Sequence, residues 1–300
     1  MGDKRADQTF EARVSATMNR LTPAERRIAR FFVDQKQAVL LGSAAQIAEL
    51  AGASDATVVR TAKSLGFDGL AALREMLLAD LTAAPSPAAR LESTLEASGA
   101  GAASALGHVV ALHESVLGVL KRPEVAKRFV RAVEILGGAV RRHVFGLGPS
   151  GAMAEYATLQ FNRIGAPTNA LSVSGIGLAD RLLAMAPGDA VLMMAYAPLY
   201  KEVTVVLDEA ERLGLPVVLV TDNLTTLFGG QVAEVLQLPR GKADHLAMHS
   251  GTAVLIEALI IGLAGRAPEA SLGSLDRLSG LRGALDKSWS KRGTRRKKSE

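Results

Sequence analysis

Short apolar runs alternate with helical stretches from residue 143 onward, and this alternation limits the folds that the chain can adopt. The runs at 190–195 (AVLMMA) and 216–221 (PVVLVT) contain few polar side chains. Strands that are apolar on both faces are typical of a parallel sheet with helices on both sides. We therefore predict a doubly wound α/β domain with a five-stranded parallel sheet. Its strands are expected at His143–Leu147, Asn169–Val173, Ala190–Ala195, Pro216–Thr221 and Glu234–Leu238.

Helical stretches separate these strands and also precede the sheet. The last of them includes Ser250–Ala264 (SGTAVLIEALIIGLA), which is apolar almost all round, more than packing on one sheet face requires. We expect part of it, together with the helices of residues 104–137, to form the interface of a homodimer or homotetramer. The expected helices span residues 104–120, 124–137, 151–164, 177–186, 200–213 and 246–264.

Residues 14–80 have a different pattern, with short amphipathic helices separated by brief turns. A helix at 44–51 ends at Gly52, a residue type that adopts the left-handed conformation common at helix C-termini. Ser54 then supplies an N-cap oxygen for a second helix at 55–64. Two helices joined in this way predict a helix-turn-helix, whose second helix enters the major groove of DNA with its N-terminus first. A plain helical hairpin with a solvated polar face is the alternative.

The outward-facing residues of this second helix are the candidate DNA contacts. Thr57 and Arg60 are placed to reach base edges, and an arginine matches the two acceptors of guanine. Lys63 suits a phosphate, and Val59 suits the methyl group of thymine. The predicted DNA-binding residues are Ser54, Asp55, Ala56, Thr57, Val59, Arg60 and Lys63.

Composition divides the chain into four segments. Residues 82–105 are rich in Ala, Ser, Gly and Pro, which is typical of a linker. Residues 281–300 carry eight Lys or Arg against two acidic residues, so the rest of the chain has a net charge of −1 although the whole is +5. We interpret this tail as disordered, with sequence-independent phosphate contacts as the alternative. The predicted segments are a helix-turn-helix domain at 1–81, the linker at 82–105, an α/β domain at 106–280 and the tail at 281–300.

Composition also excludes several classes of protein. The absence of cysteine excludes a disulfide framework and thiolate-metal chemistry. The first ten residues lack the apolar segment of a secretory signal. The most apolar run, Thr252–Gly265, contains Glu257 and is too short to span a bilayer. We therefore expect a cytoplasmic protein without a membrane partner.

Three motifs follow one another between residues 15 and 80: LT-x-x-E-x-x-I-A, A-x-x-I-A-x-x-A-x-x-S-x-x-T-V-V-R and L-G-F-x-G. Together they resemble the N-terminal domain of the RpiR family of transcriptional regulators. The chain departs from that pattern at Thr61 and Leu70, where an aromatic residue is common. Thr61 is expected to alter either packing or base preference. The resemblance implies that a double-stranded DNA operator is a partner.

The resemblance extends to residues 120–265, which are similar to the sugar isomerase (SIS) domain of such regulators, a domain that often binds a phosphosugar. Ligands of these sheets lie beyond the carboxyl ends of the strands. The loop Gly146–Gly151 (GLGPSG) follows the first strand, opens a helix and matches the G-x-G-x-S pattern of the domain. Its glycines and the helix N-terminus favour an anion. A dinucleotide site is the competing interpretation, but the second strand does not end in an acidic residue.

The loop after the third strand departs from the family. Phosphosugar-binding members have S-x-S-G-x-T there, whereas this chain has AYAPLY at 195–200. The string Ser172–Gly175 follows the second strand, so we interpret it as a coincidental match whose hydroxyls still have access to the crevice. A carboxylate or neutral ligand, a phosphate held through Lys201 or a tyrosine, and a domain kept only for dimerisation all remain open. The predicted ligand-binding residues are Gly146, Gly148, Pro149, Ser150, Gly151, Ser172, Ser174, Tyr196, Tyr200 and Thr221.

An isomerase would also need a base, for which Glu155, His245 and His249 are candidates. The two histidines have the i, i+4 spacing of metal ligands but lack a convincing third ligand. We therefore predict no catalytic residue, metal or cofactor. The sequence favours a DNA-binding regulator that senses a sugar phosphate or another carbohydrate-derived metabolite. The alternative is a sugar-phosphate isomerase-like enzyme with an accessory N-terminal domain.

Overall fold

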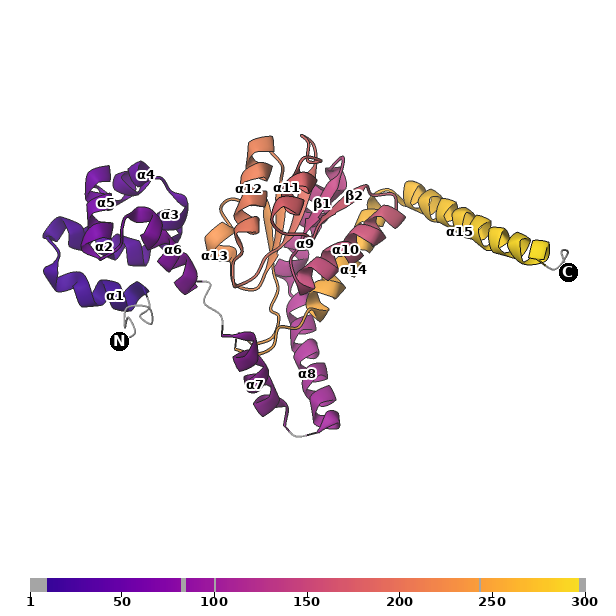
Figure 1. Ribbon diagram of the computed structural model, residues 1–300, viewed down its shortest axis with the longest axis horizontal. Helices are drawn as coiled ribbons and strands as arrows, with labels where there is room; N and C mark the ends of the chain where they lie inside the picture. The colour runs from indigo at the N-terminus through magenta and orange to yellow at the C-terminus, as the bar shows by residue number, and fades with distance from the viewer. Residues whose placement is uncertain (1–9, 82–84, 100, 243, 297–300) are drawn as a thin grey trace. The chain divides into compact units, whose positions relative to one another are not determined.

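The computed structural model describes residues 10–81, 85–99, 101–242 and 244–296, and the chain divides into two compact units after residue 84 (Figure 1). The described residues of the first unit form only helices, whereas the second unit contains a sheet. Each unit has its own hydrophobic core. This order of an all-α domain followed by an α/β domain confirms the predicted fold class.

The first unit consists of short helices whose starts are set by local capping. Thr22 and Glu25 form a capping box at the start of α2, and Ser43 and Gln46 form another at the start of α4. Each box gives partners to backbone N–H groups that a helix start otherwise leaves unpaired. The fully buried core includes Phe10, Ile28, Phe32, Ile47, Val58, Leu73 and Leu77. The elements are α1 (Phe10–Thr17), η1 (Met18–Arg20), α2 (Pro23–Asp34), α3 (Lys36–Leu41), α4 (Ala44–Ala51), α5 (Asp55–Ser64) and α6 (Leu70–Leu81).

The second unit is built on a five-stranded parallel sheet with the strand order β2-β1-β3-β4-β5. Every expected strand is present, and its bounds lie within two residues of those predicted. The strands are β1 (Arg142–Phe145), β2 (Thr168–Leu171), β3 (Ala190–Met194), β4 (Val217–Thr221) and β5 (Glu234–Gln237). The helices are α7 (Pro87–Ser98), α8 (Ala102–Leu120), α9 (Pro123–Gly138), α10 (Pro149–Arg163), α11 (Ile176–Leu182), α12 (Lys201–Leu213), α13 (Thr225–Phe228), α14 (Ser250–Arg266) and α15 (Pro268–Arg296).

Helices cover both faces of this sheet, as its apolar strands require. On one face, α9, α10 and α14 pack against alternate strand residues such as Val144, Leu192 and Val218. Helices α11 and α12, which follow β2 and β3, cover the other face (Figure 1). The chain leaves β1 toward β2 and leaves β3 toward β4, which lie on opposite sides of the β1–β3 pair, so the loops after β1 and β3 diverge at the carboxyl ends of the strands. A crevice for a ligand is expected at that point of a doubly wound sheet.

The predicted linker at 82–105 is largely helical and therefore needs correction. Helix α7 occupies Pro87–Ser98, and α8 begins at Ala102. The oxygen of Ser86 accepts a hydrogen bond from the backbone of Ala89, and Pro87 is the first helical residue. A serine cap followed by proline is a helix start, which the Ala-, Ser- and Pro-rich composition concealed. Residues 82–84 and 100 lie outside the described residues.

The predicted disordered tail at 281–300 also needs correction, because α15 continues to Arg296. Leucines recur along this helix every three or four residues, a spacing typical of an amphipathic helix. The charge count of the tail concealed this pattern. These leucines are Leu272, Leu275, Leu278, Leu281 and Leu285. Residues 297–300 lie outside the described residues.

Candidate functional site

The first candidate site is the α4–α5 pair of the first unit. Gly52 ends α4 in the left-handed conformation, with φ of 62°. Ser54 caps α5 by accepting a hydrogen bond from the backbone of Thr57 at 3.3 Å. Val58 and Ala62 are fully buried and fix the inner side of α5. The geometry is that of a helix-turn-helix, with the N-terminal turns of α5 available to a partner.

The side chains predicted to contact DNA lie on the outer side of α5. Arg60 and Lys63 are exposed, as are Ser54, Asp55 and Ala56. Thr57 and Val59, which also belong to the predicted set, are half-buried. The structure thus brings all seven predicted residues together along one helix and its cap.

Thr61, the departure that follows the arginine, lies on the inner side of α5. Its side chain is fully buried, and its hydroxyl donates a hydrogen bond to the backbone oxygen of Thr57 at 2.7 Å. Two effects were expected at this position, on packing or on base preference, and the burial of Thr61 supports the effect on packing.

Glu25 connects α2 to α5 through its carboxylate. It accepts hydrogen bonds from the backbone and hydroxyl of Thr22 and, at 2.7 Å, from the hydroxyl of Ser64 at the end of α5. These bonds, led by the one from the backbone of Thr22, lower the pKa of Glu25. The glutamate of the first sequence motif therefore helps to fix the orientation of α5.

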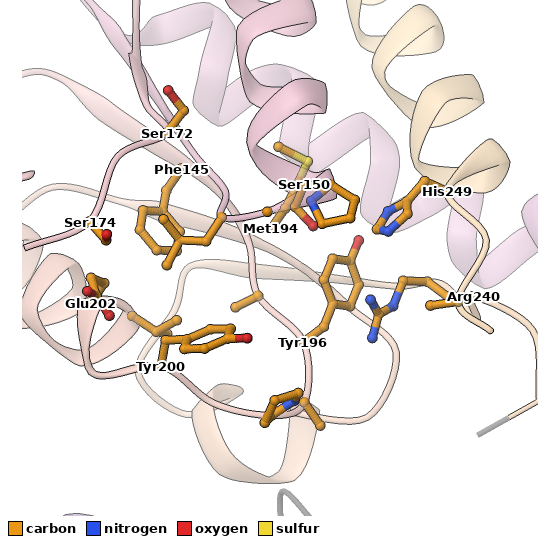
Figure 2. Close-up of a pocket in the computed structure, with 18 of the residues that line it drawn as sticks. Phe145, Ser150, Ser172, Ser174, Met194, Tyr196, Tyr200, Glu202, Arg240 and His249 are labelled. Atoms are coloured by element: carbon orange, nitrogen blue, oxygen red, sulfur yellow. The ribbon is translucent and has the colours of Figure 1, made fainter. Parts of the chain in front are cut away.

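The second candidate site is a cavity of about 920 Å³ in the second unit, at the carboxyl ends of β1 and β3 (Figure 2). Its walls come from the loops after β1, β2 and β3, from the segment between β5 and α14, and from α7. This is the edge of the sheet at which the sequence predicts a ligand. Of the predicted residues, Gly148, Pro149, Ser150, Ser172, Ser174, Tyr196 and Tyr200 line it.

The loop after β1 brings the N-terminus of α10 to the cavity. Gly148 precedes the helix with φ of 56°, and no side chain caps α10 among the described residues. Ser150 is 4% exposed and lines the cavity from the first turn. An uncapped helix start beside a serine hydroxyl favours an anionic group.

Three predicted ligand residues do not line the cavity. A Cβ at Gly146 would lie 2.4 Å from the backbone oxygen of Ser150, so this glycine permits the close turn into α10. Gly151 packs beneath the same loop, near the backbone of Gly146 and Ser172. Thr221 is fully buried, and its hydroxyl accepts a hydrogen bond from the backbone of Leu224. The structure gives these three residues a role in shaping the loops.

The loop after β3 turns Tyr196 inward. Its ring lies 3.7 Å from the guanidinium carbon of Arg240, and its hydroxyl lies 3.1 Å from that of Thr252. Arg240 also pairs with Asp222, whose Oδ2 is 2.9 Å from Nη2 and 3.0 Å from Nε. Burial raises the pKa of Tyr196 to about 12, so its hydroxyl stays neutral. An aromatic ring and an arginine thus occupy the part of the site formed by the loop after β3.

The two ends of the cavity differ in charge. Figure 2 shows Ser172, Ser174, Tyr200 and Glu202 at one end and Arg240 with Ser150, Tyr196 and His249 at the other. The Oγ of Ser172 lies 2.5 Å from a carboxylate oxygen of Glu155, a residue that does not itself line the cavity. The cavity therefore has an acidic, hydroxyl-rich end and an end with an arginine, Arg240, whose charge is paired with Asp222.

Several lining residues were missed by the sequence analysis. Arg240 follows β5 and could have been found by the rule that polar residues after parallel strands meet at one edge. Glu202 carries no such signal because it lies within the first turn of α12. Arg90 was hidden in the supposed linker. His249 was predicted only as a candidate base or metal ligand. The helix expected at 246–264 begins at Ser250, so Leu246, Ala247 and His249 precede it and line the cavity.

The two histidines before α14 have separate environments. His245 is buried, and its Nδ1 lies 2.8 Å from Oδ1 of Asp244. Burial, followed by the charge of Arg240, lowers the pKa of His249, so this side chain is neutral near pH 7. Within the described ranges, no group of three or more His, Cys, Asp or Glu is arranged to hold a metal ion.

Two family models match this chain. The helix-turn-helix domain of the rpiR family matches residues 9–84, and the SIS domain matches residues 135–259. The first match contains the α4–α5 pair, and the second contains the sheet and most of the loops around the cavity.

The chain is also similar to curated relatives. A bifunctional protein glk from Burkholderia orbicola is 28% identical over 251 residues, which make up 83% of this chain and 37% of that protein. The chain therefore spans little more than a third of such relatives. The HTH-type transcriptional regulator YbbH from Bacillus subtilis is 25% identical over 282 residues, which cover 88% of this chain and 93% of the relative.

Among solved structures, the Vibrio vulnificus NanR protein complexed with ManNAc-6P is similar to this chain. The two are 21% identical and superpose with a TM-score of 0.52 over 92% of this chain and 99% of the other. At this identity the likeness shows the fold.

Proposed function

Because the chain belongs to the RpiR family of helix-turn-helix regulators that carry a SIS domain, we propose that it is a DNA-binding transcriptional regulator whose second unit senses a small metabolite. The capped helix α5, with its predicted contacts on one outer side, is the observation that carries the DNA-binding part. Thr57 and Arg60 contact base edges, and Lys63 contacts phosphate.

Selection of binding sites from a random pool of double-stranded DNA tests this proposal. The full chain should enrich one sequence with two-fold symmetry, because dimers of such domains bind paired half-sites. Fluorescence anisotropy then measures the affinity for the selected site with and without candidate metabolites. A chain that enriches no sequence would contradict the proposal.

The effector is a carbohydrate-derived metabolite that carries an anionic group. The SIS-type cavity and the uncapped start of α10 support this class, and NanR was solved with a sugar phosphate. The serine loop is replaced by one with Tyr196 and Tyr200, so a phosphate dianion would find fewer donors to replace its hydration. We expect simple hexose phosphates to bind weakly and any tight effector to require Ser150. Calorimetry with Ser150→Ala measures this dependence.

Catalysis is not part of the proposed function. Glu155, the carboxylate that the sequence analysis offers as a base, does not line the cavity and lies against Ser172. Of the three predicted candidates, His249 lines the cavity, in its neutral form, whereas Glu155 and His245 do not line it. The isomerase alternative predicts turnover of an aldose or ketose phosphate that His249→Gln abolishes, and a regulator shows no such turnover.

We also propose that the chain is a cytoplasmic homodimer or homotetramer. Helix α8 has the length and composition of a membrane span, as do α14 and the start of α15 when taken together across their 110° bend. Leu106 and Val110 on α8 and Ile261 on α14 are exposed apolar residues that a second copy would cover. Sedimentation at micromolar concentration should show a dimer or larger species without detergent. A monomer under these conditions would contradict the assembly.

A further inference from the structure

Helix α7 forms part of the cavity wall, although its sequence resembles a linker. Pro87 and Arg90 of this helix line the cavity together with Leu246 and His249 from the segment before α14. The site therefore includes the first helix of the second unit, as well as the loops at the carboxyl ends of the strands.

Arg90 has an unsatisfied donor at this wall. Its Nε is buried and has no hydrogen-bond partner among the described residues. Buried polar groups in proteins nearly always have partners, because an unpaired one costs free energy. The guanidinium group is a planar fork that matches carboxylate and phosphate oxygens. Arg90 lines the cavity, so an acceptor on a ligand would satisfy this donor if the guanidinium group turned its Nε toward the cavity.

The other cations and anions of the cavity sharpen the expected ligand. Arg240 is already paired with Asp222, so its charge is largely balanced. Glu202 lies at the opposite end with Ser172 and Ser174. A ligand with one anionic group near α7 and hydroxyl groups toward Glu202 matches this distribution better than a ligand that is anionic at both ends.

A hydrogen bond to the segment before α14 and packing on α8 hold α7 in place. The hydroxyl of Thr94, one turn after Arg90, accepts a hydrogen bond from the backbone of Leu246 at 2.8 Å and donates one to the backbone of Arg90. Helix α7 also packs on α8, but its Leu91 and Leu95 are 45% and 60% exposed. A ligand contact at Arg90 would add to these attachments and would act on the same side of the helix as Thr94.

The position of α7 in the chain gives this contact a consequence. Helix α6 of the DNA-binding unit ends at Leu81, and α7 begins at Pro87. The chain that leaves the DNA-binding unit therefore enters the sensing unit through α7. If the ligand binds more tightly when α7 is in one position than in another, it shifts the population of molecules toward that position. The affinity for DNA then changes as well, because ligand binding and DNA binding are linked through the position of α7.

We propose that Arg90 binds the anionic group of the effector and that this contact transmits effector binding to the DNA-binding unit through α7. The inference rests on the proposed function of the chain as an effector-responsive regulator. It assigns the effector a carboxylate or phosphate at the α7 end of the cavity.

Thermal-shift measurements on the full chain test the binding step. The probes are glucose, gluconate, glucose 6-phosphate, ManNAc-6P and inorganic phosphate. Glucose is the neutral reference for gluconate, which carries a carboxylate, and for glucose 6-phosphate, which carries a phosphate. At least one anionic probe should raise the melting temperature more than glucose does. Arg90→Gln should lose most of this difference, Arg90→Lys should keep part of it, and Glu96→Gln on the exposed side of α7 should keep all of it. Equal stabilisation of wild type and Arg90→Gln, or no stabilisation by any anionic probe, would overturn the proposal.

Anisotropy with the selected DNA site tests the transmission step. Thr94→Val removes the bond to Leu246 and should retain the anion-dependent thermal shift while losing most of the change in DNA affinity that the anion causes. A normal DNA response in Thr94→Val would overturn transmission through α7. Failure to select any DNA site contradicts the proposed function, whereas a DNA response that survives Arg90→Gln unchanged contradicts this inference alone.

Discussion

The two candidate sites differ in what holds their functional side chains. On α5, Arg60 and Lys63 are exposed, and the helix that carries them is fixed by the fully buried Val58 and Ala62. In the cavity, Tyr196 is buried, and the side chain of Arg240, which stacks on it, is only 11% exposed. One site is a set of independent side chains on a supported helix, and the other is a network.

This difference has a thermodynamic consequence. An exposed side chain on a fixed helix can be replaced with little effect on folding, since few other groups depend on it. Members of a buried polar network depend on one another, and removing one leaves its partners unsatisfied. The first unit should therefore separate recognition from stability, whereas in the second unit the same residues should contribute to both.

The largest expected effect is at Arg240. Arg240→Ala leaves Asp222 without its cation and uncovers the ring of Tyr196. We expect the free energy of unfolding of the second unit to fall by about 2–4 kcal/mol, since removing one partner from a largely buried ion pair is strongly destabilising. Urea denaturation followed by circular dichroism measures this change.

Arg212→Ala is the matched control for that substitution. Arg212 forms an ion pair with Glu209 on the surface of α12, where solvent screens the interaction. Its replacement should leave the urea midpoint almost unchanged. If both variants shifted the midpoint equally, the network around Arg240 would have no special role and the comparison between the two sites would fail.

The second effect is at Arg60, where binding should change without a change in stability. We expect Arg60→Ala to weaken binding to the selected DNA site by about 1–3 kcal/mol, the range for an arginine that reads a guanine. Lys63→Ala should instead weaken binding to all sequences alike and reduce the salt dependence. Anisotropy at several salt concentrations separates the two patterns. A loss of thermal stability in Arg60→Ala would break the proposed separation of recognition from folding.

A smaller effect is expected at a helix cap of the first unit. Ser43→Ala removes the side-chain oxygen that accepts a hydrogen bond from the backbone of Gln46 at the start of α4. Losing an N-cap of this kind costs about 1 kcal/mol. Differential scanning calorimetry should show a lower melting temperature for the first unit and an unchanged transition for the second. A shift of both transitions together would show that the units do not unfold independently.

The same contrast explains how much could be predicted from the sequence. The helix-turn-helix depends on signals a few residues apart, such as Gly52 at a C-terminus and Ser54 at an N-cap. Its seven predicted contact residues do lie together, although their contact with DNA stays a prediction. The strands were predictable because residues such as Val191 and Val218 are apolar in continuous runs. Both patterns are local, so they can be read without knowledge of the fold.

The cavity depends on contacts between distant segments, and these were only partly predictable. Ser150 was predictable because the strand, loop and helix that position it are consecutive. Arg240 lies 44 residues beyond Tyr196 in the sequence, and only the strand order of the sheet brings them together. Arg90 reaches the site because α7 packs against the segment that contains Leu246. No local pattern encodes that packing, and the composition of residues 82–105 argued against it.

The smallest predicted effect concerns pH and the histidine of the cavity. Burial lowers the pKa of His249, Arg240 lowers it further, and Asp222 opposes them. A group with a lowered pKa in the folded state takes up a proton more readily when the chain is unfolded, so protonation favours unfolding. The free energy of unfolding should therefore decline as pH falls through the ordinary histidine value of 6.5. Above that pH, His249 is neutral in both states and contributes no such dependence.

His249→Gln tests this assignment because glutamine keeps a polar side chain but does not titrate. Urea denaturation at pH 8 and pH 5.5 should show a smaller loss of stability in the variant than in the wild type. The first unit lacks His249 and its network, so its calorimetric transition should respond identically to pH in both proteins. An equal decline for both proteins in the second unit would mean that burial of His249 does not govern the pH response. In that case, His249 would line the cavity without contributing to the stability of the second unit in the way that we expect of Arg240.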